Sequence, residues 1–156
     1  MAKAAKSITP PEKVNDETLR AHVGYHMKRA FNIVQADLTL TLKPFELRML
    51  TYTALALIVG NPGLSQAQLA QAMGIERPNL VVIVDELERR ELIVRDKVPT
   101  DRRAYALTAT LAGRRLFGKA NAAVIAHENR LFADMDDATR GTLTDALSRI
   151  RKQEKT

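Results

Sequence analysis

The chain of 156 residues contains no cysteine and only three histidines. Without cysteine, disulfide frameworks, thiolate catalysis and cysteine-based zinc sites are excluded, and nothing indicates an oxidising compartment. No apolar stretch approaches the roughly 20 residues that a membrane-spanning helix needs. Residues 1–15 lack the apolar segment of a secretory signal. We therefore expect a soluble, cytoplasmic protein.

The sequence also lacks the motifs of common catalysts. It has no nucleophile motif, no glycine-rich phosphate loop and no constellation of metal ligands. His22 and His26 are four residues apart on an expected helix, which is a metal-binding spacing, but no third ligand is evident. A pocket or dimer-interface role is preferred for them. The sequence thus predicts no enzyme, no metal site and no cofactor.

Acidic residues are in the minority. The chain has 24 lysines and arginines against 18 acidic residues, a formal net charge of +6. This balance favours an anionic partner, either nucleic acid or an acidic membrane surface. Residues 1–15, with three lysines and a Pro-Pro pair, resemble a flexible basic arm. The remaining length suits one domain with a core, or one domain with an extension.

Apolar residues at steps of three and four predict helices along most of the chain. One long helix is expected from Asn15 or Asp16 to Leu38, and a second from Pro44 to the Gly-Asn-Pro-Gly stop at residues 60–63. Two further helices are expected after Thr110 and after Asp136 or Asp137. The protein should be mainly helical.

Two short helices lie between these segments. Ser65 and Gln68 have capping-box spacing for one that closes on Gly74. Residues 76–91 form the next, with Pro78 in its first turn. Its expected buried face consists of Leu80, Ile83, Val84 and Leu87.

The spacing of apolar residues changes after residue 91, from a helical to an alternating pattern. A short apolar run, a polar turn with Pro99 and Asp101, and an alternating run through Tyr105 and Leu107 predict a β-hairpin with a basic tip. The two preceding helices, joined through a glycine-containing turn, form a helix-turn-helix, and the hairpin makes it winged.

This arrangement is typical of DNA binding. The helix over residues 76–91 can enter the major groove. The hairpin tip, with Arg102 and Arg103, can reach an adjacent minor groove. Phosphates would be held by backbone N–H groups at helix starts and by Ser65 and Gln66.

Residues 42–117 resemble the multiple antibiotic resistance regulator (MarR) family. The segments that carry the resemblance are LKPFELRML, GLSQAQLAQAMGI, VDELERRELI and DRRAYALTATLAGRRL. In the family, a wing arginine inserts into the minor groove and an aspartate orients the wing, roles that fall on Arg103 and Asp101. The family's Leu-Thr-x-x-Gly element appears at residues 109–113 without its leucine.

The resemblance implies a winged helix-turn-helix with N- and C-terminal dimerisation helices. It divides the chain into a flexible basic arm at 1–15, a helical dimerisation region at 16–41 and 110–156, and a DNA-binding domain at 42–109. The expected assembly is a homodimer.

Val81 and Val82 are apolar residues of the helix over residues 76–91 that its expected buried face does not need. Either one or both pack under neighbouring helices, or Val82 contacts a thymine methyl group in the major groove. In the second case, base hydrogen bonds would come chiefly from Arg77 and Asn79, because arginine suits guanine and asparagine suits adenine.

The resemblance also implies a ligand pocket between the dimerisation helices and the winged domain, commonly used by aromatic carboxylates and phenolic compounds. The stretch HVGYHMKRAF is in addition similar to regulators that sense aromatic acyl-CoA thioesters. The candidate polar groups are His22, Tyr25, His26, Arg29, Arg48 and Tyr52.

Together these features predict a ligand-responsive transcriptional regulator, preferably a repressor. It would bind palindromic duplex DNA as a homodimer, and a small aromatic acid, a phenolic compound or an aromatic acyl-CoA thioester would release it. The alternative is a winged-helix protein-interaction module without sequence-specific DNA binding. No membrane partner is expected.

Overall fold

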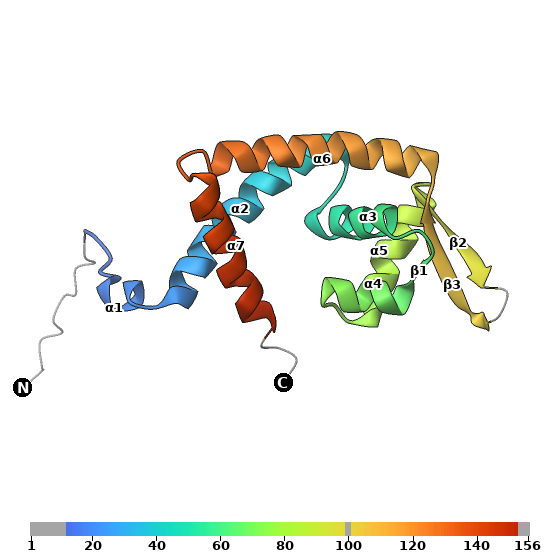
Figure 1. Cartoon of the computed structure of the whole chain (residues 1–156), viewed down its shortest axis with the longest axis horizontal. Coiled ribbons are helices and arrows are strands. Elements are labelled where there is room, and N and C mark those ends of the chain that lie inside the picture. The colour runs from blue at the N-terminus through green and yellow to red at the C-terminus, as the bar shows by residue number, and fades with distance from the viewer. Residues whose placement is uncertain (1–11, 99–100, 153–156) are drawn as a thin grey trace, which may run out of the picture. The chain divides into compact units, whose positions relative to one another are not determined.

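The computed structural model describes residues 12–98 and 101–152, with only the backbone of residues 101–104 (Figure 1). The chain divides into two compact units, of which the first ends at Ile33 and the second begins at Val34. The elements are α1 (Glu17–Arg20), α2 (Val23–Leu42), the 3-10 helix η1 (Lys43–Phe45), α3 (Met49–Gly60), β1 (Leu64–Ser65), α4 (Gln66–Met73), α5 (Arg77–Arg89), β2 (Ile93–Val98), β3 (Asp101–Ala109), α6 (Leu111–Leu131) and α7 (Asp137–Lys152). The predicted class, mainly helical with a β-hairpin wing, is confirmed. None of the described helices combines the length and the apolar character needed to cross a membrane.

The first unit contains a helix break that the sequence did not predict. The expected single helix from residue 15 or 16 to Leu38 is wrong, because α1 ends at Arg20 and α2 starts at Val23. The hydroxyl of Tyr25 donates to the Asp16 carboxylate at 2.5 Å. Residues nine positions apart on a straight helix are separated by about 13 Å along its axis. That hydrogen bond therefore requires the break.

The expected helix start at Pro44 is also wrong. Pro44 lies in η1, and α3 begins only at Met49 after Glu46 adopts a left-handed conformation with φ 52°. The Arg90 guanidinium donates to the carbonyl oxygens of Glu46 at 2.6 Å and Phe45 at 3.1 Å. These carbonyls have no helical partner, and Arg90 supplies the missing donors.

The helix-turn-helix is formed by α4 and α5, as predicted. Ser65 Oγ accepts the backbone N–H of Gln68 at 3.2 Å, and the Gln68 side chain accepts the Ser65 N–H at 3.0 Å. This is the expected capping box, and α4 closes on Gly74 at φ 63°. The four expected apolar residues of α5 are its buried residues, namely Leu80, Ile83, Val84 and Leu87.

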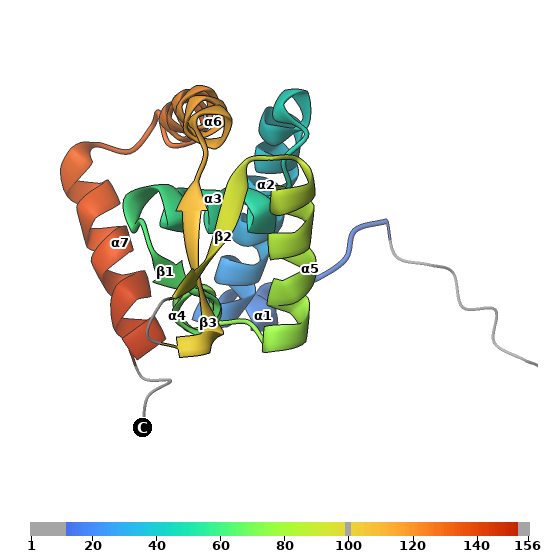
Figure 2. The same cartoon turned by 90° about the vertical axis from the view of Figure 1, so that its right-hand side faces the viewer.

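The wing is a hairpin of β2 and β3, seen beside α5 in Figure 2. A third strand, β1, pairs antiparallel with β3 and gives the order β1-β3-β2. With only two residues, β1 carries no alternation that a sequence pattern could reveal. Its Leu64 opposes Leu107, so the sheet connects the start of α4 to the hairpin.

One core unites these elements. Buried apolar side chains of α3, α4, α5 and the hairpin form a single cluster, and Leu116 and Phe117 of α6 pack against it. A smaller cluster of Leu42, Leu47 and Ala120 lies between the end of α2 and α6. As Figure 1 shows, α6 runs alongside α3 and so covers the winged helix on one side.

The junction between the hairpin and α6 is tightly closed. Thr110 caps α6 by accepting the Gly113 N–H at 3.0 Å, and its hydroxyl donates to the Glu91 carbonyl at 2.7 Å. Its backbone N–H also donates to the Leu92 carbonyl at 3.0 Å. A Cβ at Gly113 would lie 2.0 Å from that carbonyl oxygen. The Thr-x-x-Gly element therefore serves to seat α6 on the base of the wing.

A polar contact joins α2 to α6 inside the second unit. Buried His127 contacts Asp37 through Nδ1 at 2.6 Å, and Arg130 donates to the same carboxylate oxygen at 2.8 Å. The His127 hydrogen bond, followed by that from Arg130, holds the pKa of Asp37 below its ordinary value. The charged form of Asp37 is thus the form that the fold stabilises.

We predict that Gly113→Ala destabilises the protein by about 2 kcal/mol, because an added methyl group meets backbone rather than a side chain that can move. The matched control is Gly118→Ala on the same helix, where nothing lies within 4 Å. That change should stabilise by up to about 1 kcal/mol through helix propensity. Urea denaturation of both variants measures the difference. Equal stability of the two variants would contradict the close-approach argument.

The Asp37 contact predicts a pH dependence. Because the folded-state pKa lies below the ordinary 3.8, the contact stabilises the fold above that pH. The stabilisation is lost as the pH falls through the folded-state pKa. Asp37→Asn should therefore lower stability at neutral pH and flatten its decline between about pH 5 and pH 2. Denaturation midpoints across this range provide the measurement, with exposed Asp134→Asn as control. An unchanged acid profile in Asp37→Asn would count against the assignment.

Candidate nucleic-acid interface and ligand pocket

The first turn of α5 carries the expected base-contacting residues. Glu76 precedes the helix in an extended conformation, and its carbonyl accepts the N–H groups of Asn79 and Leu80. Pro78 fits this turn because its missing N–H has no helical partner there. The side chains of Arg77 and Asn79 are exposed. Their base contacts stay a prediction.

Val81 and Val82 are exposed on the same helix, at 42% and 63% of their surface. The expectation that one or both pack under neighbouring helices is wrong. With about 100° per residue, the stripe from Leu80 to Leu87 occupies one side of the helix and turns Val82 toward solvent. Val82 therefore belongs with Arg77 and Asn79 on the uncovered surface. Its thymine contact stays a prediction.

The predicted phosphate contacts lie at the start of α4. Ser65 uses its hydroxyl within the turn, accepting the Gln68 N–H and donating to the Gln68 side-chain oxygen at 2.9 Å. Gln66 is half-buried in the first helical position. Since the Ser65 hydroxyl is engaged in capping, the backbone N–H groups of this turn are the better phosphate donors. The roles of both side chains stay predictions.

The side chains of Asp101, Arg102 and Arg103 lie outside the described residues. The backbone places all three at the start of β3, where Asp101 pairs with Val98 beyond an irregularity in the ladder. The wing tip predicted from the sequence thus remains an expectation.

Sequence reasoning missed Arg95, which joins the wing to α5. Its Nε donates to Glu88 at 2.8 Å, and its Nη2 donates to Asp85 at 2.6 Å. The hydrogen bond to Glu88 raises the pKa of Arg95, and the same bond lowers the pKa of Glu88. The sequence signal was the acidic pair three residues apart on α5, but only the tertiary fold brings β2 against it. Arg95 is therefore a positioning residue for the wing.

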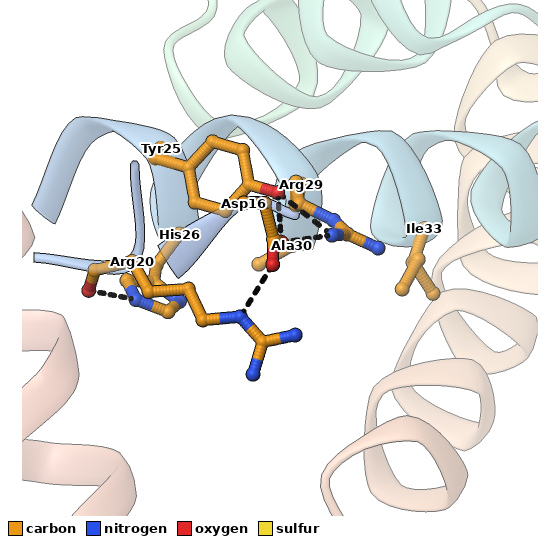
Figure 3. A pocket seen from close by; sticks show the side chains of 7 residues that line it. All are labelled: Asp16, Arg20, Tyr25, His26, Arg29, Ala30 and Ile33. Atoms are coloured by element: carbon orange, nitrogen blue, oxygen red, sulfur yellow. Dashed lines mark hydrogen bonds and ion pairs between the residues drawn. The ribbon is translucent and has the colours of Figure 1, made fainter. Parts of the chain in front are cut away.

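The first unit holds an open pocket of about 370 Å³ (Figure 3). It is lined by Asp16, Arg20, Tyr25, His26, Arg29, Ala30 and Ile33. Three of the six predicted ligand-binding residues, Tyr25, His26 and Arg29, are therefore together. His22 is exposed and is not among the lining residues.

A chain of hydrogen bonds organises the pocket. Arg29 donates to the Tyr25 hydroxyl at 2.9 Å, which in turn donates to the Asp16 carboxylate. Arg20 donates through Nε to the other Asp16 oxygen at 2.7 Å. The bond from Tyr25 is the largest cause that lowers the pKa of Asp16, with a smaller contribution from Arg20. The carboxylate is thus stabilised in its charged form.

His26 completes the wall of the pocket. Its Nε2 lies 2.9 Å from the Arg20 carbonyl oxygen. Because a carbonyl only accepts, Nε2 carries the proton of this bond. The ring also meets Tyr25 edge-on, with centroids 5.7 Å apart. His26 therefore fixes the end of α1 as well as lining the pocket.

The last two predicted ligand residues belong to the second unit. Arg48 forms an ion pair with Glu86 of α5. The Tyr52 hydroxyl donates to Asn121 at 2.9 Å, and the Tyr52 ring packs against the Phe117 ring with centroids 6.0 Å apart. Burial, followed by the negative charge of Glu128, raises the pKa of Tyr52. Both side chains have structural partners here, and their ligand roles stay predictions.

Asp16 and Arg20 are pocket residues that the sequence analysis did not select. Asp16 was predicted only as a helix start, because a continuous helix keeps it far from Tyr25 and Arg29. The available signal was its spacing of four from Arg20, which suits a local ion pair. The helix break turns that local pair into part of a larger network.

Comparison with known proteins places these features in a family. The sequence model of the MarR family matches residues 47–104. A protein of Thauera aromatica assigned as a transcriptional regulatory protein for the hcr operon is 36% identical over 138 residues, covering 88% of this chain and 83% of the relative.

Two solved structures are similar over nearly their full length. The transcriptional repressor CouR bound to a 23-mer DNA duplex has a TM-score of 0.86 and 34% identity, covering 90% of this chain and 99% of that chain. CouR from Rhodococcus jostii RHA1 bound to p-coumaroyl-CoA has a TM-score of 0.79 and 34% identity, covering 86% of this chain and 94% of that chain. With the winged helix-turn-helix already established by its own geometry, the chain belongs to the MarR family of transcriptional regulators.

Proposed function

We propose that this regulator is a repressor that binds palindromic duplex DNA as a homodimer and is released by an aromatic acyl-CoA thioester. The observation that carries the DNA part is the exposed surface of α5, where Arg77, Asn79 and Val82 are all exposed while the stripe from Leu80 to Leu87 is buried. The similar repressor CouR, bound to a DNA duplex, supports this assignment.

Exposed apolar helix faces support the homodimer. No residue of α7 is buried within the chain, although Leu143, Leu147 and Ile150 repeat at helical spacing. In α2, Phe31, Ile33 and Leu40 are exposed as well. Apolar stripes of this kind mark protein contact surfaces. A second copy of the chain is the partner that a palindromic operator requires.

The basic pocket supports a thioester over a free aromatic acid. Arg20 and Arg29 line it, and coenzyme A carries phosphate groups that guanidinium groups bind well. The similar CouR binds p-coumaroyl-CoA. Tyr25 and His26 offer hydrogen bonds to a phenolic ring substituent. A free aromatic acid or phenol is the second candidate, for which the same polar groups suffice.

Release of DNA requires unequal binding of the ligand to two states of the dimer. The ligand would favour a spacing of the two α5 helices that no longer matches half-sites about one helical turn apart. Affinity for DNA and affinity for ligand must then change by the same factor.

This linkage gives the central test. We expect an aromatic acyl-CoA to weaken binding to a duplex from the DNA upstream of its own gene about ten-fold, and that duplex to weaken thioester binding equally. Fluorescence anisotropy of a labelled duplex measures the affinity for DNA. Ligand fluorescence, which is read without background from tryptophan because the chain has none, measures the affinity for the thioester. Equal thioester affinity with and without duplex would rule out the coupling.

The same duplex distinguishes the alternative of a protein-interaction module. Each neutralised phosphate adds about 0.9 to the slope of log affinity against log salt. A regulator that uses both wings and both α4 starts should show a steep slope. A flat response, or no duplex binding, would favour the module.

We further predict that Val82 reads a thymine methyl group. Replacing thymine by deoxyuridine at one position in one half-site should weaken the wild type about five-fold, through loss of about 1 kcal/mol of apolar contact. Val82→Ala should be insensitive to that replacement. Val81→Ala, which changes the neighbouring exposed valine, is the matched control and should keep the sensitivity. If Val82→Ala keeps it too, Val82 does not read the base.

A further inference from the structure

The Asp16 carboxylate is enclosed by groups that are themselves open to solvent. Its side chain is 17% exposed, whereas those of Arg20 and Arg29 are 68% and 65% exposed. Figure 3 shows the carboxylate between the two guanidinium groups, with the Tyr25 hydroxyl beside it. Two cations thus surround one anion at the pocket.

The two arginines keep donors for a further anion. Within the described residues, the bonds to Asp16 use Nε of Arg20 and Nη1 of Arg29, the latter at 3.4 Å. A guanidinium group has five N–H donors in a planar fork that suits carboxylate and phosphate oxygens. The long Arg29 contact shows that Asp16 satisfies this arginine poorly.

The element that carries Asp16 is weakly held. Helix α1 has four residues, none of them buried, and Asp16 makes no side-chain cap for it. A segment with few buried contacts opens at low free-energy cost. Its attachment to α2 rests largely on the Asp16 contacts and on the His26 bond to the Arg20 carbonyl.

We propose that Arg20 and Arg29 form the subsite for an anionic group of the ligand, and that Asp16 is a built-in anion that occupies this subsite until the ligand displaces it. The inference rests on the proposed ligand response and assigns a regulatory residue to it. The anionic group is a phosphate of coenzyme A or the carboxylate of a free aromatic acid. Both accept hydrogen bonds from the same two guanidinium groups.

Competition predicts the direction of each substitution. Asp16→Asn removes the competing charge while keeping the size of the side chain, and should raise affinity for the anionic ligand about five-fold at low salt. Arg29→Gln should lower that affinity, and in the Arg29→Gln background Asp16→Asn should bring a smaller gain, because only Arg20 is then left for Asp16 to occupy. A residue that merely supports the pocket would give the opposite sign for Asp16→Asn.

Matched controls remove the effect of net charge. Glu17→Gln makes the same charge change as Asp16→Asn in the adjacent exposed position, and should change affinity less than two-fold, about the scale of an unpaired surface charge. Lys28→Gln is the corresponding control for Arg29→Gln, one residue away on α2. Circular dichroism melts of all variants verify that they fold.

The experiment is isothermal titration of the full-length chain with p-coumaroyl-CoA, coenzyme A and p-coumaric acid. A gain in Asp16→Asn for the thioester and coenzyme A assigns the subsite to phosphate, and a gain for the free acid assigns it to carboxylate. If the wild type binds and Asp16→Asn binds equally or more weakly, this inference is overturned while the proposed ligand response stands. Absence of binding by the wild type to all three probes overturns the proposed ligand response and this inference with it.

Discussion

The buried stripe of α5 determines what this regulator can present to DNA. Leu80, Ile83, Val84 and Leu87 are all inside the core, so the rotation of the helix about its axis is fixed. A rotation that buried Val82 would expose leucine and isoleucine and lose roughly 2 kcal/mol for each large side chain uncovered. The exposed surface of α5, which we propose contacts DNA, is thus set by packing on the opposite side of the helix.

The wing is held to α6 and to α5 by two different kinds of contact. At its base, the Gly113 backbone approaches the Leu92 carbonyl so closely that no side chain fits. Along β2, Arg95 reaches back to Asp85 and Glu88. The steric closure restricts the angle between the hairpin and α6, and the charge-assisted hydrogen bonds restrict the angle between the hairpin and α5. The proposed major-groove and minor-groove contacts would thereby be made by one rigid body.

The sequence predicted those elements whose signals lie within a few neighbouring residues. The capping box at Ser65, the four buried residues of α5, the hairpin and the Thr110 start of α6 all follow from spacing within a few residues. The break before Val23 and the η1 interruption did not follow from local spacing. The break depends on a hydrogen bond between Tyr25 and Asp16, nine positions apart, and the interruption on Arg90, 45 positions after Phe45. For the same reason the sequence found Tyr25 and Arg29 in the pocket but missed Asp16 and Arg20.

Arg95 has a consequence for how quickly the protein locates its site. A duplex approaching by diffusion responds to the summed field of the surface before any contact forms. The two negative charges of Asp85 and Glu88 would by themselves repel phosphates that approach α5. The positive charge of Arg95, paired with both, offsets half of that negative charge. A residue at the foot of the hairpin thereby influences the encounter rate, separately from the strength of the complex once formed.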